Sequence, residues 1–330
     1  MSDTKYINVT EAAELLLGQD NILIVTHRNP DGDTLGCGYS LWAALLQKGK
    51  NARVLCPSKI PAMYSFLTDK YDSYYSENDV FSPSFIVSVD TAAPSLMGKS
   101  QDLAEITDLS IDHHGSNTGY AKKTLIAPSY PSCAELIYEL FLAMDIDIDS
   151  YIAAALYTGI STDTGCYLFR NVNANSHAVT AKLIERGIDV AALNRILFET
   201  KSRALLALER MAIDTLEFYY NDRIAIITVS EEMMSVSGAE HKDMTSITPL
   251  TLKIEGVEAG ITFRILESGN VKCSLRTTRL LDASVICSQF GGGGHIGASG
   301  FECSGNLQEI KALLIRAIIS EFERKEKQGQ

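Results

Sequence analysis

The architecture of this chain follows from the segment Thr26-His27-Arg28-Asn29-Pro30-Asp31-Gly32-Asp33-Thr34-Leu35-Gly36. The apolar, β-branched residues 21–25 precede it and are typical of a buried parallel strand. Residues 35–47 predict a helix that Gly49 closes. One histidine and two aspartates therefore lie on a loop that leaves the carboxyl end of a strand, which is where open α/β sheets bind ligands.

The spacing of these three side chains suits a metal ion. His27 and Asp31 are four residues apart and Asp33 is two further on, so a turning loop can converge them. Crowded carboxylates raise each other's pKa unless a cation offsets them. Oxygen ligands with an imidazole suit Mn²⁺ or Mg²⁺. The alternative is that Asp31 and Asp33 are ordinary turn and N-cap residues, and that His27 is a polar residue at a strand end.

The same design recurs along the chain. Residues 85–90 predict a strand that ends in Asp90, and residues 109–112 predict a strand that runs into Asp112-His113-His114. Asp163 follows a helix expected at about residues 150–160. Strands that alternate with helices predict an α/β fold with a doubly wound, mostly parallel sheet. Because turns favour Asp, one such acid means little, but four recurrences indicate a shared site.

The chain length of 330 residues suggests two domains. We expect a metal-binding catalytic domain over residues 1–190, a helical connector over residues 191–220 and a smaller α+β domain over residues 221–330. Within this second domain, Glu267-Ser268-Gly269-Asn270 between two apolar runs predicts a β-hairpin.

Composition narrows the function classes. The net charge of −12 argues against binding long nucleic acid through a broad basic surface. The seven cysteines form no CxxC pair, which fits reduced thiols in a cytosol rather than a zinc ribbon or a disulfide frame. Neither a signal-peptide core nor a membrane-spanning apolar run is evident, so we expect a soluble cytoplasmic protein.

Ligands from three strand-end loops, with Asp163, would make a two-metal site. Asp90 stands alone on its strand and is the best candidate for a carboxylate that bridges two ions. Two metals activate a water molecule and clamp the attacking and leaving oxygens of a phosphoryl displacement. A dinuclear aminopeptidase is the alternative, but the anion-binding features of the second domain favour a phosphate ester.

Those features lie on the predicted hairpin of the second domain and on the glycine segment that follows it. The glycines Gly291-Gly292-Gly293-Gly294 let backbone N–H groups approach an anion, and His295 follows them. Arg276 can grip a phosphate bidentately, and Arg264 on the partner strand is a second candidate. The alternatives are a flexible glycine linker and solvated strand arginines. Tyr167 or Phe169, just after Asp163, are candidates to stack on a base, with core packing as the alternative.

These motifs, taken in order, resemble those of the DHH phosphoesterase superfamily. His27-x-x-x-Asp31-x-Asp33, Asp90, Asp112-His113-His114 and Asp163 are similar to its four motifs, and Ser274-x-Arg276 with Gly291 to His295 is similar to the DHHA1 domain. Together they cover essentially the whole chain. The compact layout resembles the branch of nanoRNases and pAp phosphatases.

The resemblance implies roles for the residues. One metal would be held by His27, Asp31 and Asp90, and the other by Asp33, Asp90, His113 and Asp163, with manganese as the usual ion and magnesium as the alternative. His114 would face the substrate phosphate or the leaving group, and Asp112 would orient a histidine. The glycine loop, His295 and Arg276 would bind the terminal phosphate or the 3′ side of a short nucleotide.

The expected function is hydrolysis of short oligoribonucleotides to mononucleotides, together with removal of the 3′-phosphate of pAp. The alternatives are a linear or cyclic dinucleotide phosphodiesterase, an exopolyphosphatase or pyrophosphatase, and a nucleotide sensor without turnover. The expected partners are short RNA or small nucleotides, with no long duplex nucleic acid and no membrane. A homodimer is left open.

Overall fold

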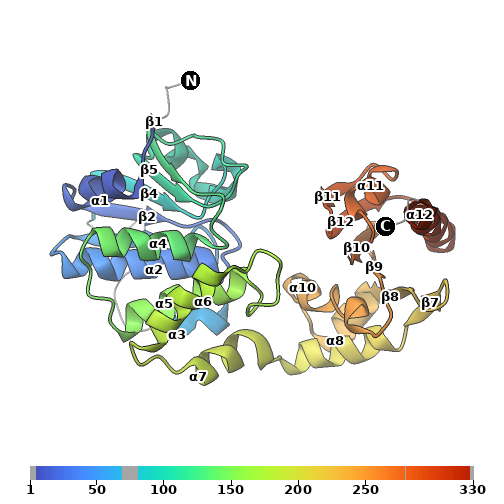
Figure 1. Cartoon of the computed structure of the whole chain (residues 1–330). Helices are drawn as coiled ribbons and strands as arrows, with labels where there is room; N and C mark the ends of the chain where they lie inside the picture. Colours follow the sequence, from blue (N-terminus) through green and yellow to red (C-terminus); the bar gives the residue numbers. More distant parts are fainter. Residues whose placement is uncertain (1–4, 69–80, 279, 328–330) are drawn as a thin grey trace. The chain divides into compact units, whose positions relative to one another are not determined.

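The computed structural model describes residues 5–68, 81–278 and 280–327. Contacts divide the chain into two compact units, residues 1–200 and 201–330 (Figure 1). Each unit has its own sheet and its own hydrophobic core. In the part of the chain that is described, no helix combines the length and the apolarity needed to cross a membrane.

The first unit is built on a parallel sheet with the strand order β1-β6-β5-β4-β2-β3. The strands are β1 (Lys5–Tyr6), β2 (Ile22–Val25), β3 (Ala52–Leu55), β4 (Phe85–Val89), β5 (Leu109–Asp112) and β6 (Lys123–Ile126). The central strands β2 and β4 are buried along their whole length, as expected for a parallel sheet covered on both faces. The predicted α/β class is confirmed, although β1 and β6 are additions to it.

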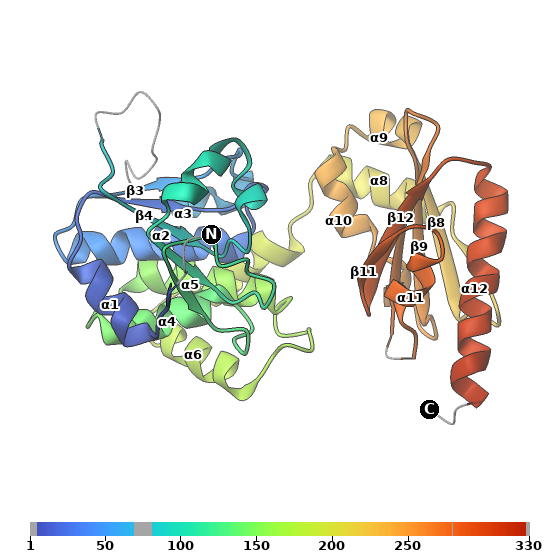
Figure 2. The ribbon, with the colours of Figure 1, turned by 90° about the horizontal axis from the view of Figure 1, so that it is seen from above.

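Helices and a 3-10 segment cover the two faces of this sheet (Figure 2). The helices are α1 (Val9–Leu17), α2 (Gly32–Gln47), α3 (Ser65–Thr68), α4 (Cys133–Ala143), α5 (Ser150–Asp163), α6 (Ala174–Ile184) and α7 (Val190–Asn194). Side chains of α1, α2, α4 and α5 pack with Ile24 and Val87 in the main core. On the other face, Met97 of the 3-10 segment Pro94–Ile106 packs with Leu23 and Val25.

The order of the strands fixes where a ligand is expected. After β2 the chain passes through α2 to β3 on one side, whereas β4 and β5 lie on the other side of β2. Open α/β sheets bind ligands at the carboxyl ends of strands at such a reversal. The loops after β2, β4 and β5 all leave the sheet at this edge.

The second unit carries a mixed sheet with the order β11-β12-β10-β9-β8-β7, in which only the described pair β8–β9 is parallel. The strands are β7 (Glu217–Tyr219), β8 (Ile224–Ser230), β9 (Ala259–Ile265), β10 (Val271–Thr277), β11 (Gly293–His295) and β12 (Ala298–Cys303). The helices are α8 (Arg203–Ile213), α9 (Glu231–Ser237), α10 (Met244–Ile247), α11 (Ala283–Ser288) and α12 (Leu307–Lys327). The β9–β10 pair is the predicted hairpin.

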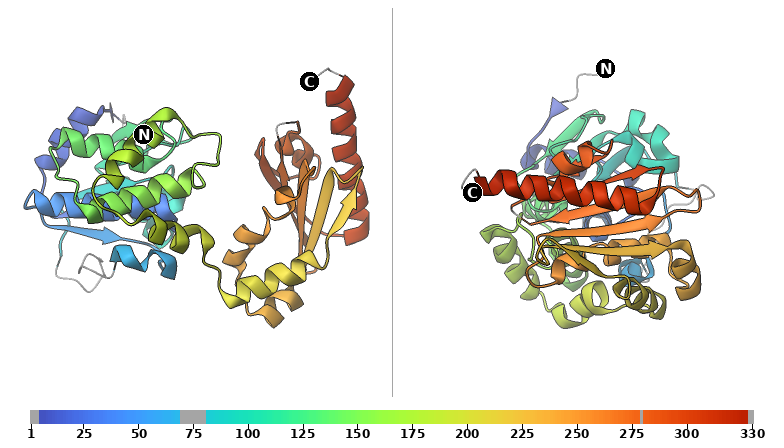
Figure 3. Two further views of the ribbon diagram at one scale, coloured as in Figure 1. Left: turned by 60° about the horizontal axis from the view of Figure 1, so that its bottom comes forward. Right: turned by 90° about the vertical axis from the view of Figure 1, so that its right-hand side faces the viewer.

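The faces of this second sheet are covered unequally. Side chains of α11 and α12 pack on one face, along which α12 lies (Figure 3). On the other face, Leu208 of α8 and Met234 of α9 pack with Ile227 of β8. Along β10, Cys273 and Leu275 are buried, whereas the alternating residue Lys272 is exposed and Ser274 and Arg276 are exposed in part. In the described part of the unit, the face over β10 and β12 therefore has a solvent-accessible row of polar side chains.

Candidate metal centre

Loops from β2 and β4 bring a first group of side chains together. His27 Nε2 lies 3.5 Å from Asp31 Oδ1 and 3.5 Å from Asp90 Oδ2. The three residues each offer a ligand atom, and these atoms lie within 4.8 Å of one another. One imidazole nitrogen and two carboxylates thus face a common point.

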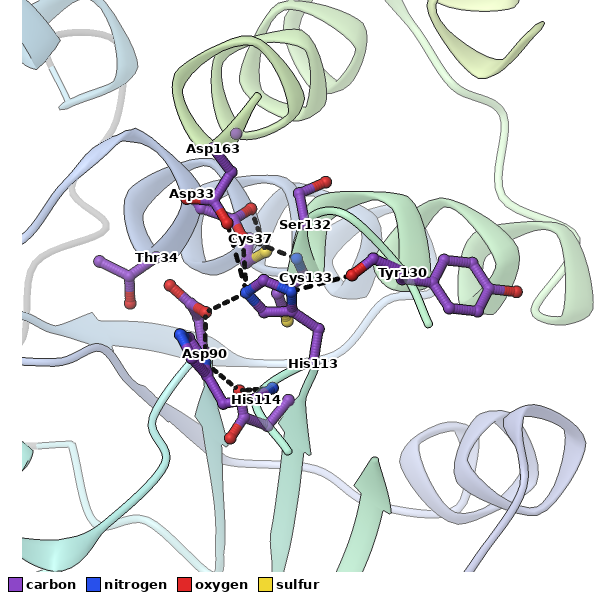
Figure 4. Close-up of polar contacts among 12 residues, drawn as sticks. Asp33, Thr34, Cys37, Asp90, His113, His114, Tyr130, Ser132, Cys133 and Asp163 are labelled. Atoms are coloured by element: carbon purple, nitrogen blue, oxygen red, sulfur yellow. Dashed lines mark hydrogen bonds and ion pairs between the residues drawn. The ribbon is translucent and has the colours of Figure 1, made fainter. Parts of the chain in front are cut away.

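Asp33, His113 and Asp163 form a second group, and Asp90 is close to both groups; Figure 4 shows Asp90 with this second group. His113 Nε2 lies 3.3 Å from Asp163 Oδ2 and 3.5 Å from Asp90 Oδ1, and it is 3.9 Å from Asp33 Oδ2. Asp163 comes from the carboxyl end of α5 rather than from a strand. Asp90 Oδ2 faces His27 and Asp90 Oδ1 faces His113, so the carboxylate stands between the two groups. Asp90 Oδ1 also lies 3.5 Å from His114 Nδ1. We call His27, Asp31, Asp33, Asp90, His113 and Asp163 the metal cluster.

Helix termini hold two of these carboxylates. Asp31 is the N-cap of α2, and its Oδ1 accepts hydrogen bonds from the N–H groups of Asp33 and Thr34, both at 3.1 Å. It is therefore a cap and a member of the cluster at once. Asp33 accepts from the N–H groups of Cys133, at 2.6 Å, and Ala134, at 2.9 Å, at the start of α4. The partial positive charge of a helix N-terminus stabilises such an anion.

Asp90 reaches its position through an uncommon backbone conformation. Its φ of 53° lies in the left-handed region, which costs a non-glycine residue about 1–3 kcal/mol. Its N–H donates to the carbonyl of Ile111 on β5 at 2.9 Å, which ties the end of β4 to the neighbouring strand. Such strain persists where the surroundings fix it, and here it accompanies a buried carboxylate.

Backbone carbonyls orient both histidines of the cluster. His27 Nδ1 lies 2.8 Å from the carbonyl of Arg28, and His113 Nδ1 lies 3.1 Å from the carbonyl of Tyr130. Because a carbonyl only accepts, each Nδ1 carries the proton, and in the neutral ring the Nε2 lone pair faces the carboxylates. This is the tautomer that a metal ion requires.

His114 is held differently from His113. Its Nδ1 lies 2.8 Å from Asp112 Oδ1, and Asp112 Oδ2 accepts from Asn117 Nδ2 at 2.6 Å. The hydrogen bond that His114 donates to the carboxylate of Asp112 raises the pKa of His114 to about 9. The side chain is half-exposed, so Nε2 stays available to a ligand. Asp112 is fully buried and serves to orient this ring.

The charges of the metal cluster are poorly stabilised by the protein alone. Burial, with Asp31 and Asp163 close by, raises the pKa of Asp90 to about 7 although His27 opposes the shift. Burial and the charge of Asp33 raise the pKa of Asp163 to about 8. Burial and Asp90 also raise the pKa of Asp33 well above its ordinary value. Burial opposes protonation of His27, but Asp31 and Asp90 outweigh it and raise its pKa to about 11.

These observations fit bound cations. Asp90 Oδ1 and His113 Nε2 are buried, and neither has a hydrogen-bond partner among the described residues. Buried polar atoms are normally satisfied, so a ligand is expected to complete them. The four carboxylates of the cluster carry up to four negative charges, which two divalent cations would neutralise. The donor set of oxygens with imidazole nitrogens suits Mn²⁺ or Mg²⁺.

The predicted substrate residues lie in the second unit. Arg276 pairs with Ala298 across β10 and β12, and Ala298 pairs with His295 across β12 and β11. Residues directly opposite in antiparallel strands point to the same face, so Arg276 and His295 flank the small Ala298 with Cα atoms roughly 10 Å apart. The next such row holds Ser274, Gly300 and Gly293. We call these two rows the sheet ledge. A pocket of about 390 Å³ is lined by its residues Arg276, Ser274, Ala298, Gly300 and Gly293, whereas His295 lies outside the lining.

Arg276 is suited to an anion. It is half-buried, burial lowers the pKa of its guanidinium, and among the described residues no carboxylate lies within 4 Å of it. Arg264 differs, because it pairs with Glu231 at 3.2 Å and contacts His241. Arg264 lies opposite Lys272, four residues along β10 from Arg276, or roughly 13 Å away. The structure thus groups Arg276 with His295 and leaves Arg264 apart.

The glycine segment is not a free loop. Gly293, Gly294 and His295 form the edge strand β11, so a flexible linker is excluded for them. Gly292 approaches β12 so closely that an added Cβ would lie 2.2 Å from the carbonyl oxygen of Gly300. The absence of a side chain at Gly292 therefore allows β12 to pack closely against it. That the backbone N–H groups of this segment bind an anion stays a prediction.

Sequence reasoning missed the groups that orient the ligands. These are the carbonyls of Arg28 and Tyr130, the N–H groups of Cys133 and Ala134, and the amide of Asn117. Most are backbone groups, which carry no signal in side-chain identity. The exception is the start of α4, which Ser132 marks as an N-cap and which could have been proposed as an anion site.

Two family models match the chain, one in each of its two units. The model of the "DHH family, N-terminal domain" matches residues 21–160, and that of the "DHHA1 domain" matches residues 221–321. The first match contains every member of the metal cluster except Asp163, and the second contains the whole sheet ledge.

Three similar proteins span nearly all of the chain. The "Bifunctional oligoribonuclease and PAP phosphatase NrnA" of Thermus thermophilus is 29% identical over 92% of this chain and 90% of its own. The "Cyclic-di-AMP phosphodiesterase PdeA" of Listeria monocytogenes is 26% identical over 92% of this chain, which spans 48% of that protein. A solved structure, an exopolyphosphatase-related protein from Bacteroides fragilis, has a TM-score of 0.84 at 23% identity and covers 96% of this chain and 97% of its own. The similarity to the Bacteroides fragilis structure shows a shared fold.

Proposed function

The chain belongs to the DHH family of phosphoesterases, with a DHHA1 domain behind the DHH domain, and from this premise we propose that it hydrolyses short oligoribonucleotides to mononucleotides and pAp to AMP. We further propose that it works with two divalent cations, Mn²⁺ ahead of Mg²⁺. The similarity to the Thermus bifunctional oligoribonuclease and PAP phosphatase over most of both chains supports this choice of substrates.

The observation that carries the two-metal proposal is the carboxylate of Asp90. Its two oxygens face two different imidazoles, each 3.5 Å away, and each imidazole lies among further carboxylates. A carboxylate between two ions is the usual way to hold them about 3.5–4 Å apart. His27 and Asp31 would hold one ion with Asp90, and Asp33, His113 and Asp163 the other.

In the mechanism, the chain's own residues orient the reacting groups. Two bound cations would supply charge neutralisation and an activated water for attack on the phosphate. Asp112 holds the ring of His114 through Nδ1, which leaves Nε2 free to donate a hydrogen bond to a phosphate oxygen or the leaving oxygen. The backbone contacts to His27, His113 and Asp33 keep the ligands in place beforehand, so little rearrangement is needed.

The sheet ledge would hold the end of the substrate that is not cut. Arg276 can bind a phosphate through two parallel hydrogen bonds, with His295 and Ser274 on the same face. One such arginine suits a short nucleotide with a terminal phosphate. Polyphosphate would favour a longer row of cations, and a dinucleotide phosphodiesterase would share the same site.

Product release in the presence of Mn²⁺ tests the proposal. The substrates are pAp, an RNA dinucleotide, an RNA five-mer, a linear dinucleotide from a cyclic parent, and polyphosphate. Wild type is run beside Asp90→Ala, with Asp147→Ala as an exposed acidic control outside the cluster. Mononucleotide release from the short RNAs and AMP from pAp, lost only in Asp90→Ala, is the expected result. Turnover of polyphosphate alone, or of the linear dinucleotide from the cyclic parent alone, would overturn the substrate assignment.

A further inference from the structure

A short apolar segment follows the cluster residue Asp163. Leu168 is 84% exposed and Phe169 58% exposed, on the connection between α5 and α6 (Figure 2). Exposed large apolar side chains side by side carry a cost in water, and they often mark a binding surface. The exposure of Leu168 and Phe169 therefore requires an explanation.

The segment has a fixed conformation. Gly165, Cys166 and Tyr167 have successive φ values of 57°, 53° and 64°, all in the left-handed region. The N–H groups of Leu168 and Phe169 both donate to the carbonyl of Thr164 at 3.0 Å. Three consecutive left-handed residues persist only where the surroundings hold them, and such strain gathers at functional sites.

Asn171 ties this segment to the metal cluster. Its Nδ2 donates to the carbonyl of Asp163 at 3.0 Å and to the carbonyl of Pro131 at 3.1 Å. Pro131 follows Tyr130, whose carbonyl orients His113. The backbone of the segment is therefore tied to two parts of the chain that position the cluster.

The two aromatic residues of the segment have different roles. Tyr167 stacks on His177 of α6, with ring centroids 5.0 Å apart, and its hydroxyl hydrogen-bonds Thr180 at 2.6 Å. Its ring is thus used in packing. Phe169 folds back over Gly165, where an added Cβ would lie 2.4 Å from the ring atom Cζ. One part of the Phe169 ring rests on this glycine, two residues from Asp163, while over half of the side chain stays exposed.

We infer that Phe169 is the stacking surface for a nucleobase of the substrate, with Leu168 extending the apolar contact. The inference rests on the proposed function, since a nucleotide is what brings an aromatic base to a phosphate-hydrolysing site. Base–aromatic stacking needs an accessible ring with few degrees of freedom, which this segment supplies. A phosphate chain without bases would gain nothing from an apolar ring here.

The test compares substrates with and without a base. Wild type, Phe169→Ala and Phe169→Trp are assayed with Mn²⁺ on an RNA dinucleotide and on the same dinucleotide with one base removed. Leu142→Ala removes a comparably exposed apolar side chain from α4 and is the matched control. Calorimetric titration with Mn²⁺ and with AMP checks metal and product binding in each variant.

We expect the ratio of kcat/KM for the complete dinucleotide to that for the base-lacking one to fall about tenfold in Phe169→Ala. The ratio should persist in Phe169→Trp and Leu142→Ala, and AMP binding should weaken in Phe169→Ala alone. An unchanged ratio in Phe169→Ala, or equal losses on both substrates, would overturn the stacking role while leaving the proposed function standing. Absence of nucleotide turnover in wild type would overturn both.

Discussion

The metal cluster and the sheet ledge place polar side chains in opposite ways. In the cluster, six side chains from strand ends and a helix end meet within 3.3–3.9 Å of their neighbours, and backbone groups fix their orientation. On the ledge, Arg276 and His295 stand apart over small residues and face solvent. The cluster has charge that the protein cannot stabilise alone, whereas the ledge offers one unpaired cation. We therefore expect cluster residues to govern chemistry and ledge residues to govern affinity.

The largest effect should come from Asp90→Asn. The amide keeps the size of the side chain, and Asn tolerates the left-handed φ of 53°, so the fold should survive. Loss of the carboxylate between the two groups should lower kcat by roughly 10³-fold or more. Steady-state kinetics with Mn²⁺ measure this.

The thermal stability of metal-free Asp90→Asn provides a second test of the role of Asp90. The buried Asp90 carboxylate has a raised pKa, so removing its charge should raise the melting temperature of the metal-free protein. Wild-type activity in Asp90→Asn would refute the role of the cluster. A lower melting temperature without metal would instead show that Asp90 has a structural function.

A second effect concerns pH. The pKa values of Asp90 and Asp163, about 7 and about 8, lie above their ordinary value of 3.8, so the folded metal-free protein binds protons that the unfolded chain has released. The stability that these two carboxyl groups contribute is therefore greatest at low pH and is lost as pH rises toward 8. Metal binding must displace these protons and the proton of His27, so affinity for Mn²⁺ should fall at least about 100-fold from pH 8 to pH 6.

Thermal unfolding in chelator and in excess Mn²⁺, at pH 5 to 8, checks both statements. In chelator the melting temperature should fall as pH rises, and the gain from Mn²⁺ should grow over the same window. A Mn²⁺ affinity independent of pH would contradict the raised pKa values.

Much of the cluster could be predicted from the sequence because the topology of a parallel sheet determines where the loops after its strands lie. Parallel strands end at one edge, so acids that follow β2, β4 and β5 have to meet. Asp31 shows the limit of this reasoning: the sequence presents a helix cap and a cluster residue as alternatives, yet Asp31 caps α2 and also lies in the metal cluster.

The ledge was harder to predict, since it depends on strand register. Arg264 and Arg276 both lie on hairpin strands, but only pairing shows that Arg264 faces Lys272 and bonds Glu231. The glycines also predicted a loop, because a three-residue edge strand built of two glycines and a histidine has no apolar alternation to reveal it.

Asp112→Asn should have an intermediate effect. Asp112 lies outside the cluster but orients His114, so its loss should lower kcat roughly 10- to 100-fold. Affinity for Mn²⁺ should stay within about threefold of wild type, because no ligand is lost. Kinetics beside calorimetric titration separate the two quantities. A large loss of metal affinity would place Asp112 among the ligand-supporting residues instead.

The smallest effects should distinguish the two arginines. Arg276→Ala removes the half-buried cation without an acidic partner, so KM for pAp and for short RNA should rise about tenfold while kcat changes little. Arg264→Ala removes a cation of β9 that is already paired with Glu231 of α9, and KM should change less than about twofold. Both variants lose an arginine side chain, and the two arginines lie on adjacent strands. A difference in KM between the variants therefore reflects the position of the arginine rather than the total charge. Equal effects would mean that the sheet contributes only a diffuse positive field, and the ledge would then have no specific role in substrate binding.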